Sequence, residues 1–216
     1  MKNTIHQSSL WIYLAVILLS LNGGYINAAT IISFLHNAVG YVTGNIALSG
    51  TYLAKDDYMM FLSAILLVIS FLIGAILSGL IIEDINYNKD YRYKANLILQ
   101  LILVSISIVL IYYKQTYCQY LLAMAMGLQN AMTTHYGSAL IRTTHMTGTT
   151  TDLGILVAYW IKKKKVKIWK IKLYSMLILF FLIGSILGGI IFTNFQEKSL
   201  FIPVLIYLIM IFLSKK

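Results

Sequence analysis

The sequence predicts an all-α polytopic membrane protein with about six transmembrane helices. Of its 216 residues, 59% are hydrophobic and 11% are charged, whereas soluble globular proteins carry about 25% charged residues. Long apolar stretches recur along the chain, and a bilayer core forces such segments to satisfy their own backbone hydrogen bonds as helices. The two halves also repeat one another. The charged linkers 83–94 and 162–172 are too short for a soluble domain, so we expect one integral membrane domain over 1–216.

The expected helices follow the apolar runs. In chain order the runs are 10–21, 58–82, 95–113, 117–128, 174–192 and 200–213. The first run resembles a secretory signal peptide, because Lys2 precedes it and a small-residue sequence, YINAAT, follows it. We interpret it as a retained first helix, since its Gly-x-x-Asn-Ala pattern returns at 127–131, where no signal peptide can lie.

Three segments of the first half return in the same order in the second half. They are GYINA (24–28) with GLQNA (127–131), TGN (43–45) with TGT (147–149), and FLIGAILSG (71–79) with FLIGSILGG (181–189). The last pair is identical at seven of nine positions. Matches in a conserved order indicate a duplication, with repeat 1 at about 8–113 and repeat 2 at about 117–214.

The distribution of basic residues predicts how the repeats are oriented. Each repeat holds about three crossings, and an odd number turns the second copy upside down relative to the first. The positive-inside rule places the lysine-rich loop 162–172 in the cytoplasm, and six crossings then place both termini there. The other basic residues inside would be Lys2, Lys89, Arg92, Lys94, Lys215 and Lys216, with Lys55, Lys114 and Lys198 outside. If 30–54 and 143–161 also crossed, giving eight helices, this bias would weaken.

Small residues mark the repeated FLIG segments as helix-packing surfaces. Gly74 and Ser78 in the first half, and Gly184 and Gly188 in the second, have the small-xxx-small spacing that lets two backbones approach closely in lipid. We expect these two helices to pack against each other across the pseudo-symmetry axis of the repeats.

The lysine-rich run Lys162–Lys172 is expected to be mainly a topology anchor. It also predicts binding of anionic lipid headgroups, at about 1 kcal/mol per basic residue near the membrane surface. The net charge of +10 does not indicate nucleic-acid binding, because the basic residues are not interleaved with the aromatics of a stacking platform.

Two polar segments interrupt the apolar pattern, near 30–54 and 132–161. We interpret Thr43–Gly44 and Thr147–Gly148 as breaks, followed by short helices at about 45–54 and 150–161. Asn and Thr side chains cap the free amides of a first helical turn, and Asp152 would suit the positive end of the helix dipole.

Broken helices that end at a polar cavity are the construction many secondary transporters use for their substrates. We therefore expect a substrate site between the repeats, lined by Asn27, Thr43, Gly44, Asn45, Gln129, Asn130, Arg142, Thr144, Thr147, Gly148 and Asp152. The alternative is that both segments are polar re-entrant or interfacial hairpins that only link crossings.

The charged residues of the second segment leave two interpretations open. Arg142 and Asp152 form either a structural ion pair or a substrate clamp, and Asp152 is the one carboxylate candidate for proton coupling. His135 and His145 are ten residues apart and no H-x-x-x-H or paired-cysteine spacing occurs, so no metal or other cofactor is expected. The absence of a nucleophile-elbow pattern argues against a hydrolase, and we expect no enzymatic activity.

The motifs GLQNA…IRTTHMTGTTTDLG and GGYINA…YVTGN resemble the YoaK family, a domain-of-unknown-function family of bacterial inner-membrane proteins. The resemblance covers essentially the whole chain and implies a six- or seven-helix protein of the bacterial inner membrane. It implies no activity, substrate or catalytic residue. In that family an aspartate usually precedes the alanine of the first motif, where this chain has Asn27; proton or cation coupling through that position would be lost here.

The leading functional hypothesis is therefore a small secondary transporter or permease for an unidentified solute or ion. The alternative is a non-transporting membrane scaffold or assembly protein, in which the repeated motifs only cap and pack helices. The sequence specifies neither the substrate nor the coupling ion, and it leaves homo-oligomer formation open.

Overall fold

A computed structural model describes residues 9–82, 91–136 and 142–214. Three parts of the sequence predictions therefore fall outside the described residues: the terminal lysines Lys2, Lys215 and Lys216, the loop 83–90 with Lys89, and the stretch 137–141 of the second polar segment. The described chain is helical, with no strand in these three ranges.

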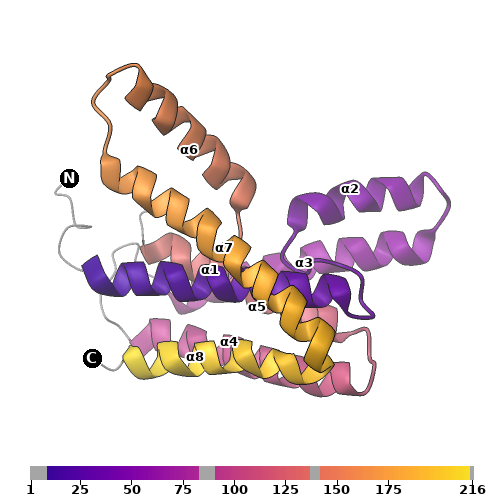
Figure 1. Cartoon of the computed structure of the whole chain (residues 1–216). Helices are drawn as coiled ribbons and strands as arrows, with labels where there is room; N and C mark the ends of the chain where they lie inside the picture. Colours follow the sequence, from indigo (N-terminus) through magenta and orange to yellow (C-terminus); the bar gives the residue numbers. More distant parts are fainter. Residues whose placement is uncertain (1–8, 83–90, 137–141, 215–216) are drawn as a thin grey trace.

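The helices of the two halves follow one another in the same order along the chain. The elements are α1 (Ser9–Ile32), α2 (Val42–Leu53), α3 (Tyr58–Ile81), α4 (Tyr91–Tyr112), α5 (Cys118–Tyr136), α6 (Met146–Ile161), α7 (Ile168–Phe195), the 3₁₀ turn η2 (Gln196–Leu200) and α8 (Phe201–Leu213). In each half a long helix is followed by a short one, α2 or α6, which makes a hairpin with the next long helix, α3 or α7 (Figure 1).

Four described stretches are long and apolar enough to cross a bilayer: Tyr13–Ile32, Tyr58–Ile81, Tyr91–Tyr112 and Ile168–Leu213. The last one contains both α7 and α8, and the chain reverses direction between them at η2 (Figure 1). The burial pattern is that of a membrane protein: on α3, Ser70, Gly74 and Ser78 are buried while large apolar side chains such as Leu72 and Leu80 are exposed. Apolar side chains lose nothing by facing lipid, so small and polar residues are left for the helix interfaces.

The most extensive helix contacts cross between the two halves. Helix α1 packs along α7, and α5 packs along α3. Helices α4 and α8 lie side by side beneath them, and the start of α1 and the end of α8 lie on the same side of the bundle (Figure 1). Each half therefore completes its helix packing with a helix from the other half.

Glycines at matching sequence positions allow these two crossings. A Cβ on Gly24 of α1 would lie 2.0 Å from the carbonyl oxygen of Phe181, and a Cβ on Gly127 of α5 would lie 2.0 Å from that of Phe71. Phe71 and Phe181 are both the first residue of the FLIG segment. The obstructing atoms are backbone and cannot move away, so both crossings require glycine.

The four small residues of the FLIG segments have different partners from those expected. Gly74 meets Met124 on α5, while Gly184 and Gly188 meet α1 backbone at Leu21 and Tyr25. Ser78 accepts a 2.7 Å hydrogen bond from Asn96 of α4. The FLIG helices therefore pack on helices of the opposite repeat rather than on each other, because the complementary glycines lie on α1 and α5.

Candidate binding site at the starts of α2 and α6

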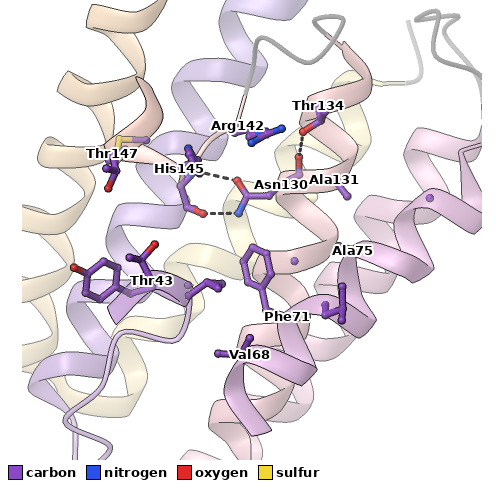
Figure 2. A pocket seen from close by; sticks show the side chains of 18 residues that line it. Thr43, Val68, Phe71, Ala75, Asn130, Ala131, Thr134, Arg142, His145 and Thr147 are labelled. Carbon is purple, nitrogen blue, oxygen red and sulfur yellow. Dashed lines mark hydrogen bonds between the residues drawn. The ribbon is translucent and has the colours of Figure 1, made fainter. Parts of the chain in front are cut away.

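The two polar segments meet at one cavity. The cavity has a volume of about 590 Å³, within the usual range for small-molecule sites. Residues just before and at the start of α2 and α6 form one side of it, and α3 and α5 form the other (Figure 2). Its lining includes Tyr41, Thr43, Val68, Phe71, Asn130, Thr134, Arg142, Thr144, His145 and Thr147.

The breaks lie a few residues earlier in the chain than the sequence suggested. Helix α2 begins at Val42 and α6 at Met146, so both Thr-Gly pairs lie inside the first helical turn. Neither helix has a side-chain cap: Tyr41 and His145 occupy the N-cap positions without making such a bond. The predicted capping by Asn and Thr side chains is wrong.

The polar side chains of the first turns bond elsewhere. Thr149 and Thr151 donate to the carbonyls of His145 and Thr147, one turn back along α6. Asn45 donates to the carbonyl of Ala38 at 3.3 Å. Such back-bonds are the usual way for hydroxyl and amide side chains to be satisfied inside a helix, and they leave the amides of the first turn without a side-chain acceptor.

The glycine of each Thr-Gly pair accommodates an aromatic ring. A Cβ on Gly44 would lie 2.0 Å from Cε1 of Tyr41, and a Cβ on Gly148 would lie 2.4 Å from Cε1 of His145. In both segments the ring of the residue before the helix therefore folds over the first turn. The glycines position these rings at the cavity wall and do not themselves line the cavity.

Two matching asparagines hold the polar segments in place. The side chain of Asn27 accepts a 2.8 Å hydrogen bond from the amide of Gly40 and donates to the carbonyl of Gly23 at 2.7 Å. The side chain of Asn130 accepts a 3.1 Å bond from the amide of Thr144 and donates to the carbonyl of Met126 and to the Thr144 hydroxyl (Figure 2). Both side chains have local partners, and each fixes the backbone just before a short helix.

Gln129 joins four elements in the interior. Its oxygen accepts hydrogen bonds from Tyr207 of α8 at 3.0 Å and Asn22 of α1 at 3.4 Å. Its amide nitrogen donates to the carbonyl of Leu19 at 2.9 Å and to the Thr143 hydroxyl at 2.8 Å. The Gln129 side chain is completely buried and lies outside the cavity. Its hydrogen bonds therefore connect helices.

Arg142 and Asp152 are separated. Both side chains are exposed, but Arg142 lines the cavity and Asp152, on α6, does not. No ion pair joins them in the described part of the chain. The structural-pair interpretation is therefore wrong. Among the described residues Arg142 has no ion-pair partner, and Arg142 and Asp152 act on His145 with opposite electrostatic effects.

The cavity thus contains Thr43, Asn130, Arg142, Thr144 and Thr147 from the predicted set. Asn27, Gly44, Asn45, Gln129, Gly148 and Asp152 lie outside its lining. The sequence reasoning missed Tyr41, His145 and Phe71. An aromatic residue three positions before each repeated glycine was the signal for Tyr41 and His145. Within 9–82, 91–136 and 142–214, no three His, Cys, Asp or Glu side chains form a group that could hold a metal ion.

The apolar spans, the small-residue interfaces and the cavity at two helix starts are those of an α-helical membrane protein with a cavity lined by both polar and apolar residues. Residues 15–213 match a family model described as Protein of unknown function (DUF1275), and the chain belongs to that family. No curated protein and no solved structure matches it.

Proposed function

We propose that the protein is a small secondary transporter or permease whose solute binds in the cavity between α3, α5 and the starts of α2 and α6. The observation that carries this proposal is the meeting of two short polar helix starts, one from each half, at a single cavity with an arginine that has no ion-pair partner among the described residues. Paired helix interruptions in repeated halves are the usual sequence pointer to a transport site.

The proposed topology has six crossings: α1, α3, α4, α5, α7 and α8. Helix α8 has 13 residues but continues from α7 within one apolar span, Ile168–Leu213, whereas α2, with 12 residues, and α6, with 16, each contain a Thr-Gly pair in their first turn. Both run outward from the middle of the bundle, α6 toward the upper left and α2 toward the right (Figure 1), and this divergence supports two inverted repeats with re-entrant segments. The resemblance to the YoaK family supports a bacterial inner-membrane location, and the positive-inside rule applied to the loop 162–172 supports cytoplasmic termini.

The second proposed ligand is lipid. Seven lysines lie between Lys162 and Lys172, all on exposed or half-buried positions around the α6–α7 turn. Lys164 and Lys170 lie over the rings of Tyr159 and Trp169, at 5.2 and 5.8 Å from the centroids. Aromatic rings at headgroup depth beside lysines suit the negatively charged surface of the cytoplasmic leaflet.

Cysteine accessibility tests whether both segments share the site. Thr43→Cys and Thr147→Cys, each in a Cys118→Ala background, should react with small thiol reagents, and a bulky adduct at one position should slow labelling at the other. Thr151→Cys is the control, because it is exposed on α6 outside the cavity. Labelling of the two cavity positions from opposite membrane faces with no mutual protection would contradict a shared site.

Transport itself is tested by filling the cavity. Ala131→Leu places a larger side chain in the lining, and should abolish any flux that distinguishes producing cells from deletion cells across a panel of labelled metabolites and ions. Gly154→Leu is the matched control, since an added side chain there meets nothing within 4 Å. If no solute distinguishes producing cells from deletion cells, the proposal fails.

The scaffold alternative is favoured by one observation: Asn27, Asn130 and Gln129 are occupied by bonds within the protein. This function would need a defined partner that co-purifies with the protein. It also predicts that Ala131→Leu leaves partner binding and cell physiology unchanged.

A further inference from the structure

We infer that the cavity takes a small organic anion, with its charge beside Arg142 and its apolar part against α3. This inference rests on the proposed function and specifies the substrate class of that same site. Its basis is the distribution of charge and apolar surface over the cavity lining.

The described charge in the cavity is positive. Arg142 is the one arginine or lysine of the lining, and no aspartate or glutamate is part of it. The nearest acid along the chain, Asp152, lies outside and makes no ion pair with Arg142. A guanidinium remains charged at any physiological pH and presents a fork of donors that fits a carboxylate. Arg142 is exposed in the cavity wall. The one aspartate, glutamate, lysine or arginine among the lining residues is thus positive, and it favours an anionic ligand.

The surrounding backbone reinforces this preference. The cavity lies at the first residues of two helices, with Val42 and Thr43 from α2 and Met146 and Thr147 from α6 in its lining. The first-turn amides of a helix lack intrahelical acceptors, and neither start has a side-chain cap or an acidic residue in its first turn. Two positive dipole ends and Arg142 therefore act on one space.

The opposite wall indicates an organic ligand. Helix α3 contributes Val68, Phe71, Leu72 and Ala75 to the lining, which cannot hydrogen-bond an inorganic oxyanion. A cavity of about 590 Å³ also exceeds what a single inorganic ion fills. The arrangement fits a small molecule with one anionic group and an apolar body.

Thermal stabilisation by charge-matched probes tests the inference. The purified full chain in lipid nanodiscs is titrated with carboxylates (acetate, butyrate, hexanoate, benzoate) and with the amines of the same skeletons at constant ionic strength. We expect at least one carboxylate to raise Tm in a saturable way while its amine does not. Phosphate and sulfate should stabilise at least tenfold more weakly. Equal effects of acid and amine, or stabilisation by phosphate and sulfate alone, would overturn the inference.

Substitutions of Arg142 test whether its positive charge binds the carboxylate. Arg142→Gln should weaken the best carboxylate at least tenfold, and Arg142→Lys, which keeps the charge, should restore part of that loss. Arg92→Gln is the matched control, because the other arginine lies at the start of α4, outside the cavity. Unchanged affinity in Arg142→Gln would contradict the assignment.

The two proposals fail differently. If the cells or proteoliposomes show flux of a neutral or cationic solute that Ala131→Leu blocks, the protein is a transporter and the anion assignment is wrong. If carboxylates bind through Arg142 but no solute crosses the membrane, the site is an anion site and the transport proposal is wrong.

Discussion

The segments that lead into α2 and α6 have the same construction and different chemistry. In both, an asparagine one helix back bonds the backbone just before the short helix, and an aromatic ring folds over a glycine in the first turn. The chemical difference is in the residues that surround these features. Arg142 and Thr144 stand where the first segment has Ala38 and Gly40.

This comparison separates scaffold from function. Features shared by the two segments hold backbone in place, and so the repeated motifs that attracted attention in the sequence are mostly structural. Within the cavity lining, the arginine and the additional hydroxyl of Thr144 come from the second segment. The second half is therefore where we expect substrate specificity to be determined.

Glycine substitutions should have the largest effect and should affect both halves equally. Gly24→Ala and Gly127→Ala each drive a Cβ into a backbone carbonyl, and we expect each to destabilise the fold by about 3 kcal/mol or more. The measurement is denaturant unfolding in mixed micelles, with Gly50→Ala as the control because its added Cβ meets nothing within 4 Å. A large difference in the free energy of unfolding between the two variants would show that the α1–α7 and α3–α5 crossings are not equivalent.

Gln129 should show the next largest effect, and here the halves differ. The matching residue of the first half is Ile26, so Gln129→Ile installs the residue of one half in the other. It removes four hydrogen bonds, for an expected loss of about 2–4 kcal/mol. Tyr207→Phe, which removes one of the four, should cost much less. Equal losses of stability in Gln129→Ile and Tyr207→Phe would contradict the role of Gln129 in connecting several helices.

Substitution of Asn27 and Asn130, which bond the backbone before α2 and α6, should have intermediate effects on stability. Asn130→Ala and Asn27→Ala should each cost about 1–3 kcal/mol, with the larger cost for Asn130 because it bonds both the amide and the hydroxyl of Thr144. Asn27→Asp keeps the acceptor for the Gly40 amide and should be milder than Asn27→Ala. The measurement is Tm together with protease cleavage before α2. A lower Tm for Asn27→Asp than for Asn27→Ala would show that the hydrogen bond donated to the Gly23 carbonyl contributes more than the one accepted from Gly40.

The smallest effect is expected at the ion pair that joins the α4–α5 turn to η2. Lys114 donates to the Glu197 carboxylate and holds the pKa of Glu197 below its usual range. The stabilisation is full above the ordinary carboxyl pKa and disappears as pH falls through the lowered one. Because Lys114 is mostly exposed, Glu197→Gln should cost less than about 1 kcal/mol. Unfolding between pH 2 and 7 should show a weaker acid dependence in this variant, and an unchanged one would contradict the assignment.

The sequence predicted the helical fold and the long apolar helices well, but not where the polar helices end. The apolar run 117–128 continues as helix to Tyr136. It does so because Thr133 and Thr134 bond to carbonyls of the preceding turn and Gln129 is satisfied by distant helices. Hydropathy counts such residues as breaks, since it cannot show which partners will reach them.

The candidate site was predictable only in part for the same reason. That the two Thr-Gly segments belong together follows from their repetition. The separation of Gln129 from the cavity depends on Tyr207, 78 residues away in sequence, and the lack of an Arg142–Asp152 ion pair depends on how the start of α6 is placed. A single sequence carries neither piece of information.

The exchange of partners between the halves also constrains how the chain assembles during synthesis. Helix α1 is made first, yet its close partner α7 is made near the end. Until then Gly24, which packs against the α7 backbone at Phe181, lacks that partner. Helix α3, by contrast, gains α5 after only one intervening helix. The α1–α7 crossing can therefore form only after α7 has been inserted, whereas the α3–α5 crossing can form earlier.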